Sequence, residues 1–381
     1  MQPTRAFQYG APAFTFLALS VALALSGCSR NDDSAIQTGP TPATSAAAIP
    51  PAPTEPTPAT TPAPADAQMQ AVLDQLAKLG GKPIETLSPA EARQQPSPAD
   101  AVKALIESQG MRATPEAVAS VEDSTFAGPG GNVAIRIYKP GGAGPLPVVL
   151  YVHGGGWVIA DLDAYDASPR ALANAAQAIV VSTHYRQGPE HKFPAAHDDV
   201  LAAYQWVLAN AEKLGGDPRR IAVVGESAGG NMAANVAIAA RDQGWQAPLA
   251  QVLVYPVADN DLNSPSYIEN ANAKPLNKPI IEWFVQHYLS TPEESADPRI
   301  ALVRQSNLAG LPPATIILAQ IDPLRSDGEK YADKLKAAGT PVTVHRYDGV
   351  AHEFFGMGAV VDKAKAAQQA AAAALRQAFG T

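Results

Sequence analysis

A serine between two glycines is the first residue of this chain whose setting suggests chemistry. Residues 225–229 read G-E-S-A-G, after an apolar run at 221–224 and before a helical stretch at 228–241. In a sharp turn from strand to helix this pattern exposes the serine hydroxyl, and a side chain at either glycine would clash. The pattern alone also occurs in structural turns. Its setting predicts Ser227 as a nucleophile.

Three consecutive glycines follow another predicted strand, 148–152. They come directly after His153, at 154–156. Backbone N–H groups in such a run can approach a substrate oxygen closely and stabilise an oxyanion, and the N–H of Ala228 adds a donor after the nucleophile. The alternative of a phosphate-binding loop is poor, since neither a following Lys-Ser/Thr nor G-x-G-x-x-G spacing is present. We expect His153 to order the loop by hydrogen bonding.

An acid and a base follow two further strands in the required chain order. Asp322 comes after the strand predicted at 315–319, and His352 after the strand at 342–346. His352 would take the serine proton, and Asp322 would orient the imidazole. Asp327 and Asp297 are rival acids, although Asp327 begins a predicted helix, where a carboxylate often only complements the dipole.

Short β-branched runs alternate with helical stretches from about residue 124. This alternation predicts an α/β fold with a mainly parallel sheet covered by helices on both faces, and chemistry at the carboxyl ends of the strands. Strands are expected at 133–138, 148–152, 179–183, 221–224, 252–255, 315–319 and 342–346. Helices are expected at 198–211, 228–241, 280–289, 326–338 and 360–379, and throughout 67–122, where Ser97 opens a helix as its N-cap.

Composition limits the possible partners. The 381 residues are 17% charged with a net charge of −8, and Lys and Arg do not gather in runs, which argues against nucleic acid as a partner. The single cysteine excludes an intramolecular disulfide and a cysteine-rich zinc site. No H-E-x-x-H or similar ligand spacing is present, so no metal or cofactor is expected.

The first 66 residues read as a targeting segment and a tether. Residues 1–27 carry a single charge, Arg5, before an apolar run, as in a secretory signal. Leu25-Ser26-Gly27-Cys28 resembles the bacterial lipobox, which implies cleavage before Cys28 and lipidation of its thiol; the alternative is an ordinary signal with a chance cysteine. Residues 28–66 are rich in Pro, Ala and Thr and are predicted to be a disordered spacer.

Four blocks together resemble the hormone-sensitive-lipase-like family of α/β-hydrolase esterases (bacterial esterase family IV). They are 153–157, 185–196, 225–231 and 322–328. The resemblance implies an α/β-hydrolase fold over about 68–379. It implies Ser227, Asp322 and His352 as a catalytic triad and Gly155, Gly156 and Ala228 as oxyanion donors. It also implies a cap from residues 67–123 and an insertion at 258–300, on a catalytic domain of 124–381.

The chain departs from the family pattern beside the expected site. Where this chain has Gln187 and Gly188, the family usually has Leu and Ala. Where this chain has Glu226 and Glu353, the family usually has Asp and Gly. Glu353 places a carboxylate next to the expected base and is predicted to raise the pKa of His352. These changes leave the triad atoms intact and put substrate preference in question.

These observations predict an exported carboxylesterase for short- to medium-chain esters, anchored to a membrane surface through lipidated Cys28. Ser29, where an Asp would favour the inner membrane, points to the outer membrane, with a periplasmic or extracellular protein as the alternative. A homodimer is a further possibility. An amidase, a peptidase or a polysaccharide deacetylase with the same triad remains open, as does a ligand-binding protein on the same fold.

Overall fold

The computed structural model describes residues 63–381. The predicted signal segment (1–27), Cys28 and nearly all of the predicted tether (28–66) lie outside the described residues. Within 63–381, no helix is both long enough and apolar enough to cross a membrane.

One eight-stranded sheet forms the centre of the described chain, in the order β1-β2-β4-β3-β5-β6-β7-β8. The pairs β1/β2 and β2/β4 are antiparallel and all other pairs are parallel. This arrangement confirms the predicted α/β-hydrolase fold. The strands are β1 (Ser120–Gly128), β2 (Gly131–Lys139), β3 (Leu146–Val152), β4 (Ile179–Thr183), β5 (Gly216–Glu226), β6 (Gln251–Val254), β7 (Ala314–Ile321) and β8 (Val342–Ala351).

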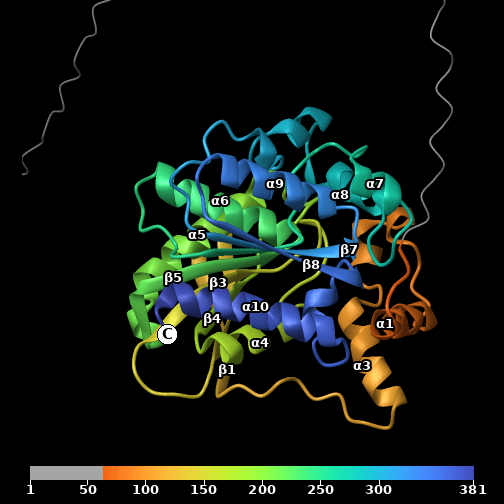
Figure 1. The fold of residues 1–381 in the computed structure, drawn as a ribbon, viewed down its shortest axis with the longest axis horizontal. Helices are drawn as coiled ribbons and strands as arrows, with labels where there is room; N and C mark the ends of the chain where they lie inside the picture. Colours follow the sequence, from red (N-terminus) through yellow and green to blue (C-terminus); the bar gives the residue numbers. More distant parts are fainter. Residues whose placement is uncertain (1–62) are drawn as a thin grey trace, which may run out of the picture. The chain divides into compact units, whose positions relative to one another are not determined.

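Helices cover both faces of the sheet (Figure 1). On one face lie α5 (Ala195–Asn210), α6 (Ala228–Asp242) and α9 (Arg325–Ala337), and on the other α4 (Ala167–Ala176) and α10 (Asp362–Phe379). Alternate residues of β3 therefore enter different cores: Val148 and Leu150 pack in one, Val149 and Tyr151 in the other. Because both faces are buried, the strand reads as a continuous apolar run.

Two helical segments outside the sheet lie near the candidate site. The N-terminal segment contains α1 (Ala67–Lys78), η1 (Ile84–Thr86), α2 (Pro89–Ala92) and α3 (Pro98–Ser108). Between β6 and β7 lie α7 (Pro265–Glu269), α8 (Lys278–Tyr288), η3 (Pro292–Ala296) and η4 (Leu302–Arg304). The predicted N-cap is confirmed, since the Ser97 side chain accepts a hydrogen bond from the Asp100 N–H.

The expectation that residues 67–122 are helical throughout is wrong beyond α3. The last helix of this segment ends at Ser108, and β1 begins at Ser120. β1 lies at the edge of the sheet and most of its side chains are exposed, so it lacks the buried apolar run by which the other strands were recognised. The pattern also does not predict α4, which lies between β3 and β4, or the short helix α7, which follows β6, although it predicts these strands.

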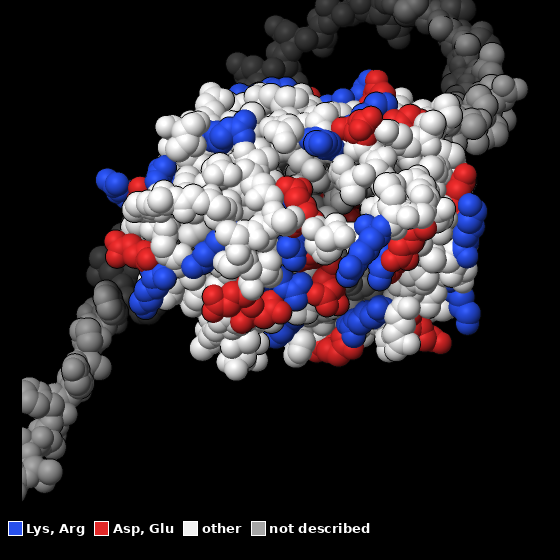
Figure 2. Space-filling view, turned by 90° about the horizontal axis from the view of Figure 1, so that it is seen from below, with Lys and Arg blue, Asp and Glu red and all other residues white. Residues whose placement is uncertain are grey.

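Charges of both signs are mixed on the surface that Figure 2 shows from below. Many of the charged side chains form ion pairs, such as that of Arg136 with Asp123 at 2.6 Å. Exposed pairs of this kind each contribute little to stability. The fold therefore depends on the two apolar cores rather than on its surface charges.

Candidate active site

Ser227 lies on a sharp turn between β5 and α6. Its backbone has φ 57° and ψ −120°, a conformation that costs energy for a residue other than glycine. A Cβ at Gly225 would collide with the carbonyl of Gly229, and a Cβ at Gly229 with the carbonyl of Val152. Both glycines are therefore needed for the turn, as the motif implies.

Three side chains that are far apart in the sequence are joined by hydrogen bonds. His352 Nε2 lies 3.0 Å from Ser227 Oγ, and His352 Nδ1 lies 2.8 Å from Asp322 Oδ2. The other carboxylate oxygen of Asp322 accepts a hydrogen bond from the Leu324 N–H at 2.8 Å. All three side chains are buried, and each follows the carboxyl end of a parallel strand. This arrangement can transfer the serine proton to the imidazole.

The charge around His352 favours its protonated form. Burial acts to lower its pKa, but the neighbouring carboxylates Asp322, Glu353 and Glu226 outweigh burial and raise the pKa above its ordinary value. The imidazolium that forms when the serine is deprotonated is therefore stabilised.

The glycine loop lies against the same cavity as Ser227. Gly155 has φ 92° and Gly156 has φ 57°, and both line the cavity. A Cβ at Gly155 would collide with the carbonyl of Ile159, and one at Gly156 with the ring of Phe284. Ala228 is the first residue of α6, so its N–H belongs to the free donors of a helix N-terminus. These positions suit donors to a developing oxyanion.

His153 holds the loop and does not contact the serine. Its Nδ1 lies 2.9 Å from the carbonyl oxygen of Gly154, and its Nε2 lies 3.0 Å from His184 Nδ1. Burial lowers the pKa of His153 to about 3, so the ring is neutral at pH 7. Tyr185 donates a hydrogen bond to the same carbonyl at 2.7 Å.

The two rival acids have other partners. Asp327 is fully buried and accepts hydrogen bonds from the N–H groups of Ala258 (3.1 Å) and Asp259 (3.0 Å). Asp297 pairs with Arg299 at 2.9 Å. Only Asp322 of the three contacts His352.

A cavity of about 1070 Å³ opens above Ser227. The N-terminal segment and the 258–300 insertion both line it, through residues such as Ile84 and Ile280. The two segments are joined where Trp283 Nε1 donates to the Leu87 carbonyl at 3.0 Å. Arg93 ties the N-terminal segment to the sheet domain through Glu190 (2.7 Å) and the Val158 carbonyl (2.9 Å).

Gln187 and Gly188, two of the residues that depart from the family pattern, lie beside the glycine loop. Gln187 donates hydrogen bonds to the carbonyls of Ile159 (2.8 Å) and Ala160 (2.9 Å). A Cβ at Gly188 would lie 2.7 Å from the His287 carbonyl. The usual alanine would therefore force α8 away from the segment that carries Gly188.

The other two residues that depart from the family pattern, Glu226 and Glu353, accept hydrogen bonds from tyrosines that the sequence analysis did not identify. Glu226 accepts hydrogen bonds from Tyr151 (2.5 Å) and Tyr255, and Glu353 from Tyr165 (2.5 Å). Neither a tyrosine in or after a strand nor one in a loop gives a sequence signal of this role, because its partner is distant in the sequence. Among residues 63–381, no group of three or more potential metal ligands comes together.

Comparison with known proteins agrees with this geometry. A family model described as the alpha/beta hydrolase fold matches residues 149–356. The chain belongs to the α/β-hydrolase family. This α/β-hydrolase is 44% identical to carboxylesterase NlhH of Mycobacterium tuberculosis over 252 residues, which are 65% of this chain and 79% of the relative. It is 35% identical to an ethyl acetate hydrolase of Pseudomonas putida over 288 residues, 74% of this chain and 88% of the relative.

A solved structure leads to the same class. An ester hydrolase from the Lake Arreo metagenome, solved with a bipyridine phosphonate derivative, is 38% identical with a TM-score of 0.74. The match covers 83% of this α/β-hydrolase and 99% of that chain. The predicted resemblance to α/β-hydrolase esterases is thus confirmed, and the relatives are carboxylic ester hydrolases.

Proposed function

We propose that this α/β-hydrolase is a carboxylesterase that acts through Ser227, His352 and Asp322. The observation that carries the proposal is the continuous series of hydrogen bonds from Ser227 Oγ through the imidazole to Asp322. Ser227 Oγ attacks the ester carbonyl while His352 Nε2 takes its proton. Asp322 holds Nδ1–H and stabilises the imidazolium.

The N–H groups of Gly155, Gly156 and Ala228 hold the oxyanion of the tetrahedral intermediate. His352 then gives its proton to the leaving alcohol, and an acyl-enzyme remains on Ser227. A water molecule, deprotonated by His352, hydrolyses the acyl-enzyme and restores the serine.

The N-terminal segment and the 258–300 insertion act as a cap that limits the acyl chain to short or medium length. The apolar residues that they place in the cavity, Ile84, Leu276, Ile280 and Phe284, support this proposal. So does the relative whose name is ethyl acetate hydrolase.

Hydrolysis of p-nitrophenyl butyrate tests the function. Ser227→Ala is expected to lower kcat by on the order of 10⁴ or more and to abolish labelling by a fluorophosphonate at this residue. Ser108→Ala removes a hydroxyl exposed on α3 and should leave both unchanged. Full turnover by Ser227→Ala would refute the mechanism. Faster hydrolysis of butyranilide than of the ester would instead favour an amidase.

We also propose that the protein is exported and lipid-anchored at Cys28, with the outer membrane as its destination. The Leu-Ser-Gly-Cys sequence at 25–28 supports this proposal. The full chain expressed in a Gram-negative host should incorporate a palmitate analogue, and Cys28→Ser should lose it. Incorporation that persists in the variant would exclude Cys28 as the site. A homodimer stays a prediction that the mass in solution tests.

A further inference from the structure

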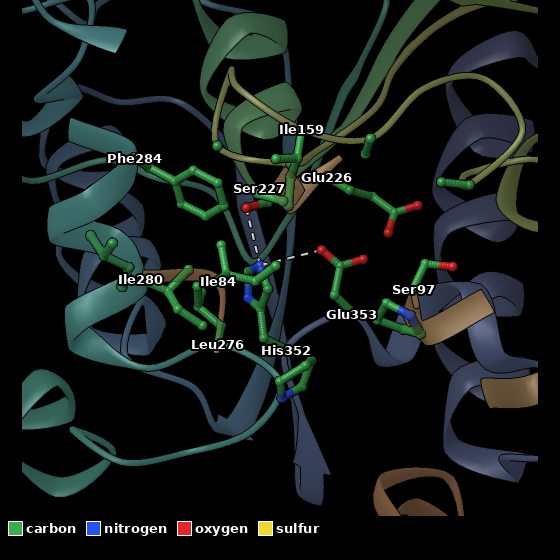
Figure 3. Close-up of a pocket in the computed structure, with 18 of the residues that line it drawn as sticks. Ile84, Ser97, Ile159, Glu226, Ser227, Leu276, Ile280, Phe284, His352 and Glu353 are labelled. Carbon is green, nitrogen blue, oxygen red and sulfur yellow. Dashed lines mark hydrogen bonds and ion pairs between the residues drawn. The ribbon is translucent and has the colours of Figure 1, made fainter. Parts of the chain in front are cut away.

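The cavity has two chemically different walls (Figure 3). One side of the cavity, beside the Ser227–His352 pair, is apolar and is formed by Phe284, Ile280, Leu276 and Ile84. The opposite side, which we call the carboxylate wall, carries Glu226, Glu353 and Ser97. The two glutamates raise the pKa of His352 but neither donates nor accepts a proton in the proposed mechanism. The carboxylate wall is therefore a candidate for a separate role.

Glu353 presents one carboxylate oxygen to the cavity. Its side chain is 21% exposed, and its Oε1 atom accepts the hydrogen bond of Tyr165. The same atom lies 3.8 Å from His352 Nε2. Within residues 63–381, Oε2 makes no hydrogen bond, and it is not shut off from the cavity. This oxygen is available to a ligand.

Apart from His352, no basic side chain of residues 63–381 pairs with the carboxylate wall. Glu226 is buried behind Glu353 with both oxygens bonded to tyrosines, and no Lys or Arg of the described chain pairs with either glutamate. Buried carboxylates are normally paired with positive charge, so a cation from outside the chain has the chemistry that suits this wall.

The position of Glu353 identifies which part of an ester it would meet. His352 Nε2 gives its proton to the leaving alcohol, so the alcohol oxygen must lie beside this nitrogen. Glu353 is 3.8 Å from the same nitrogen. The oxyanion loop, by contrast, packs against Phe284 at Gly156. The alcohol thus points toward the glutamates, and the acyl chain toward the apolar wall.

We propose that Glu353, backed by Glu226, forms a subsite that selects esters whose leaving alcohol carries a positive charge. A quaternary ammonium two carbons from the ester oxygen, as in a choline ester, has the chemistry that this wall would recognise. The Tyr165 ring on the same wall can add a cation–π contact. The proposal rests on the proposed esterase function and specifies its substrate class.

The titratable groups around Glu226 and Glu353 determine how the selectivity for a cationic alcohol depends on pH. Tyr151, Tyr165 and Tyr255 have pKa values raised well above the ordinary value by burial, and so remain neutral donors. His352, after the end of β8, and Asp322, after the end of β7, are the other titratable groups that act on Glu353. Burial, with the charge of Glu353, raises the pKa of Glu226 to about 7, and burial raises that of Glu353 against the opposing effect of His352.

The negative charge of the pair therefore grows as pH rises through neutrality. A cation with a fixed charge should gain affinity in the same direction, whereas an uncharged isostere should not. Selectivity for the cation should increase from pH 6 to pH 8.

The test compares choline butyrate with its carbon isostere, 3,3-dimethylbutyl butyrate. The ratio of their kcat/KM values cancels effects on the proton transfer that both substrates share. We expect a ratio of about tenfold or more in favour of choline at pH 8. Glu353→Gln keeps the size of the side chain but removes its charge, and should bring the ratio to about one.

Two further variants make the test specific. Glu353→Gly accepts the φ of 70° at this position without strain, and should lose the selectivity even if Glu353→Gln folds poorly. Asp161→Asn removes an exposed charge that also lines the cavity, and should leave the ratio within about twofold.

The outcomes separate this proposal from the esterase function. Hydrolysis of p-nitrophenyl butyrate together with a wild-type ratio near or below one would overturn the subsite and leave the function standing. Equal selectivity in the Glu353 variants would also overturn it. If no ester is hydrolysed, calorimetry with choline decides: binding to the wild type that is lost in Glu353→Gln supports the subsite, and no binding refutes it.

Discussion

At the scale of single residues, the site depends on backbone conformations that few side chains allow. Ser227 has a positive φ, and Gly155 is held at φ 92° with the Ile159 carbonyl against it. The conformation of Ser227 would be costly in isolation, so the surrounding structure stabilises it. At Gly155 glycine adopts the positive φ without strain, and any side chain would collide with the Ile159 carbonyl. The chemistry of the loop is therefore sensitive to a single added methyl group.

Gly155→Ala is expected to lower kcat for p-nitrophenyl butyrate by about 10²–10³-fold, the usual effect of losing one oxyanion donor. The new Cβ would collide with the Ile159 carbonyl and displace the N–H of the loop. Steady-state kinetics measures this loss. Gly215→Ala is the matched control, because Gly215 has φ 88° but open space around its Cβ position. It should lower stability and leave kcat unchanged; equal losses in both variants would contradict the proposed oxyanion role.

At the scale of elements, α6 holds the 258–300 insertion, which is part of the proposed cap. Asn231, four residues after the nucleophile, donates hydrogen bonds to the carbonyls of Val257 (3.0 Å) and Ile300 (2.8 Å). Asn235 donates to the carbonyl of Arg299 at 2.8 Å. The helix that begins at the nucleophile thus fixes both ends of the segment that lines the cavity.

Asn231→Ala should destabilise the protein by about 2–3 kcal/mol, because it leaves buried carbonyl groups without donors. Chemical denaturation measures this change. It should also raise KM, since the insertion loses the hydrogen bonds of Asn231 to the carbonyls of Val257 and Ile300. Asn210→Ala removes a local hydrogen bond of α5 to the Trp206 carbonyl and should cost far less. A KM unchanged in Asn231→Ala would show that the insertion does not shape the substrate site.

At the scale of the whole molecule, the carboxyl group of Glu226 is buried next to Ser227, where stability and the proposed function have opposite needs. Burial, followed by the charge of Glu353, raises the pKa of Glu226 from 4.5 to about 7. The folded state then binds this proton more tightly than the unfolded state does. The contribution of Glu226 to stability is greatest below about pH 4.5 and is lost as the pH rises to about 7.

Glu226→Gln should therefore stabilise the protein at pH 8 relative to the wild type by up to about 3 kcal/mol more than at pH 4.5. Urea denaturation at the two pH values measures this difference. Asp333→Asn removes an exposed carboxyl on α9 and should give the same change at both. If the free energy of unfolding of the wild type falls no faster between pH 4.5 and pH 8 than that of Glu226→Gln, the Glu226 carboxyl is already ionised in the folded state at pH 4.5.

The amino-acid sequence by itself determined the order of the chemical groups and the buried elements that carry them. Ser227, Asp322 and His352 each follow an apolar run, and strands buried on both faces have a pattern that can be read locally. The edge strand β1 could not be found in this way, because its exposed side chains leave no such pattern.

Only the tertiary structure decided what the side chains meet. The choice of Asp322 over Asp327 depends on which carboxylate reaches His352, and the loop length alone does not specify this distance. The tyrosines that hold Glu226 and Glu353 come from β3, from the loop before α4 and from the end of β6. Contacts of this kind arise from packing between distant segments, so the carboxylate wall became visible only when the sheet was assembled.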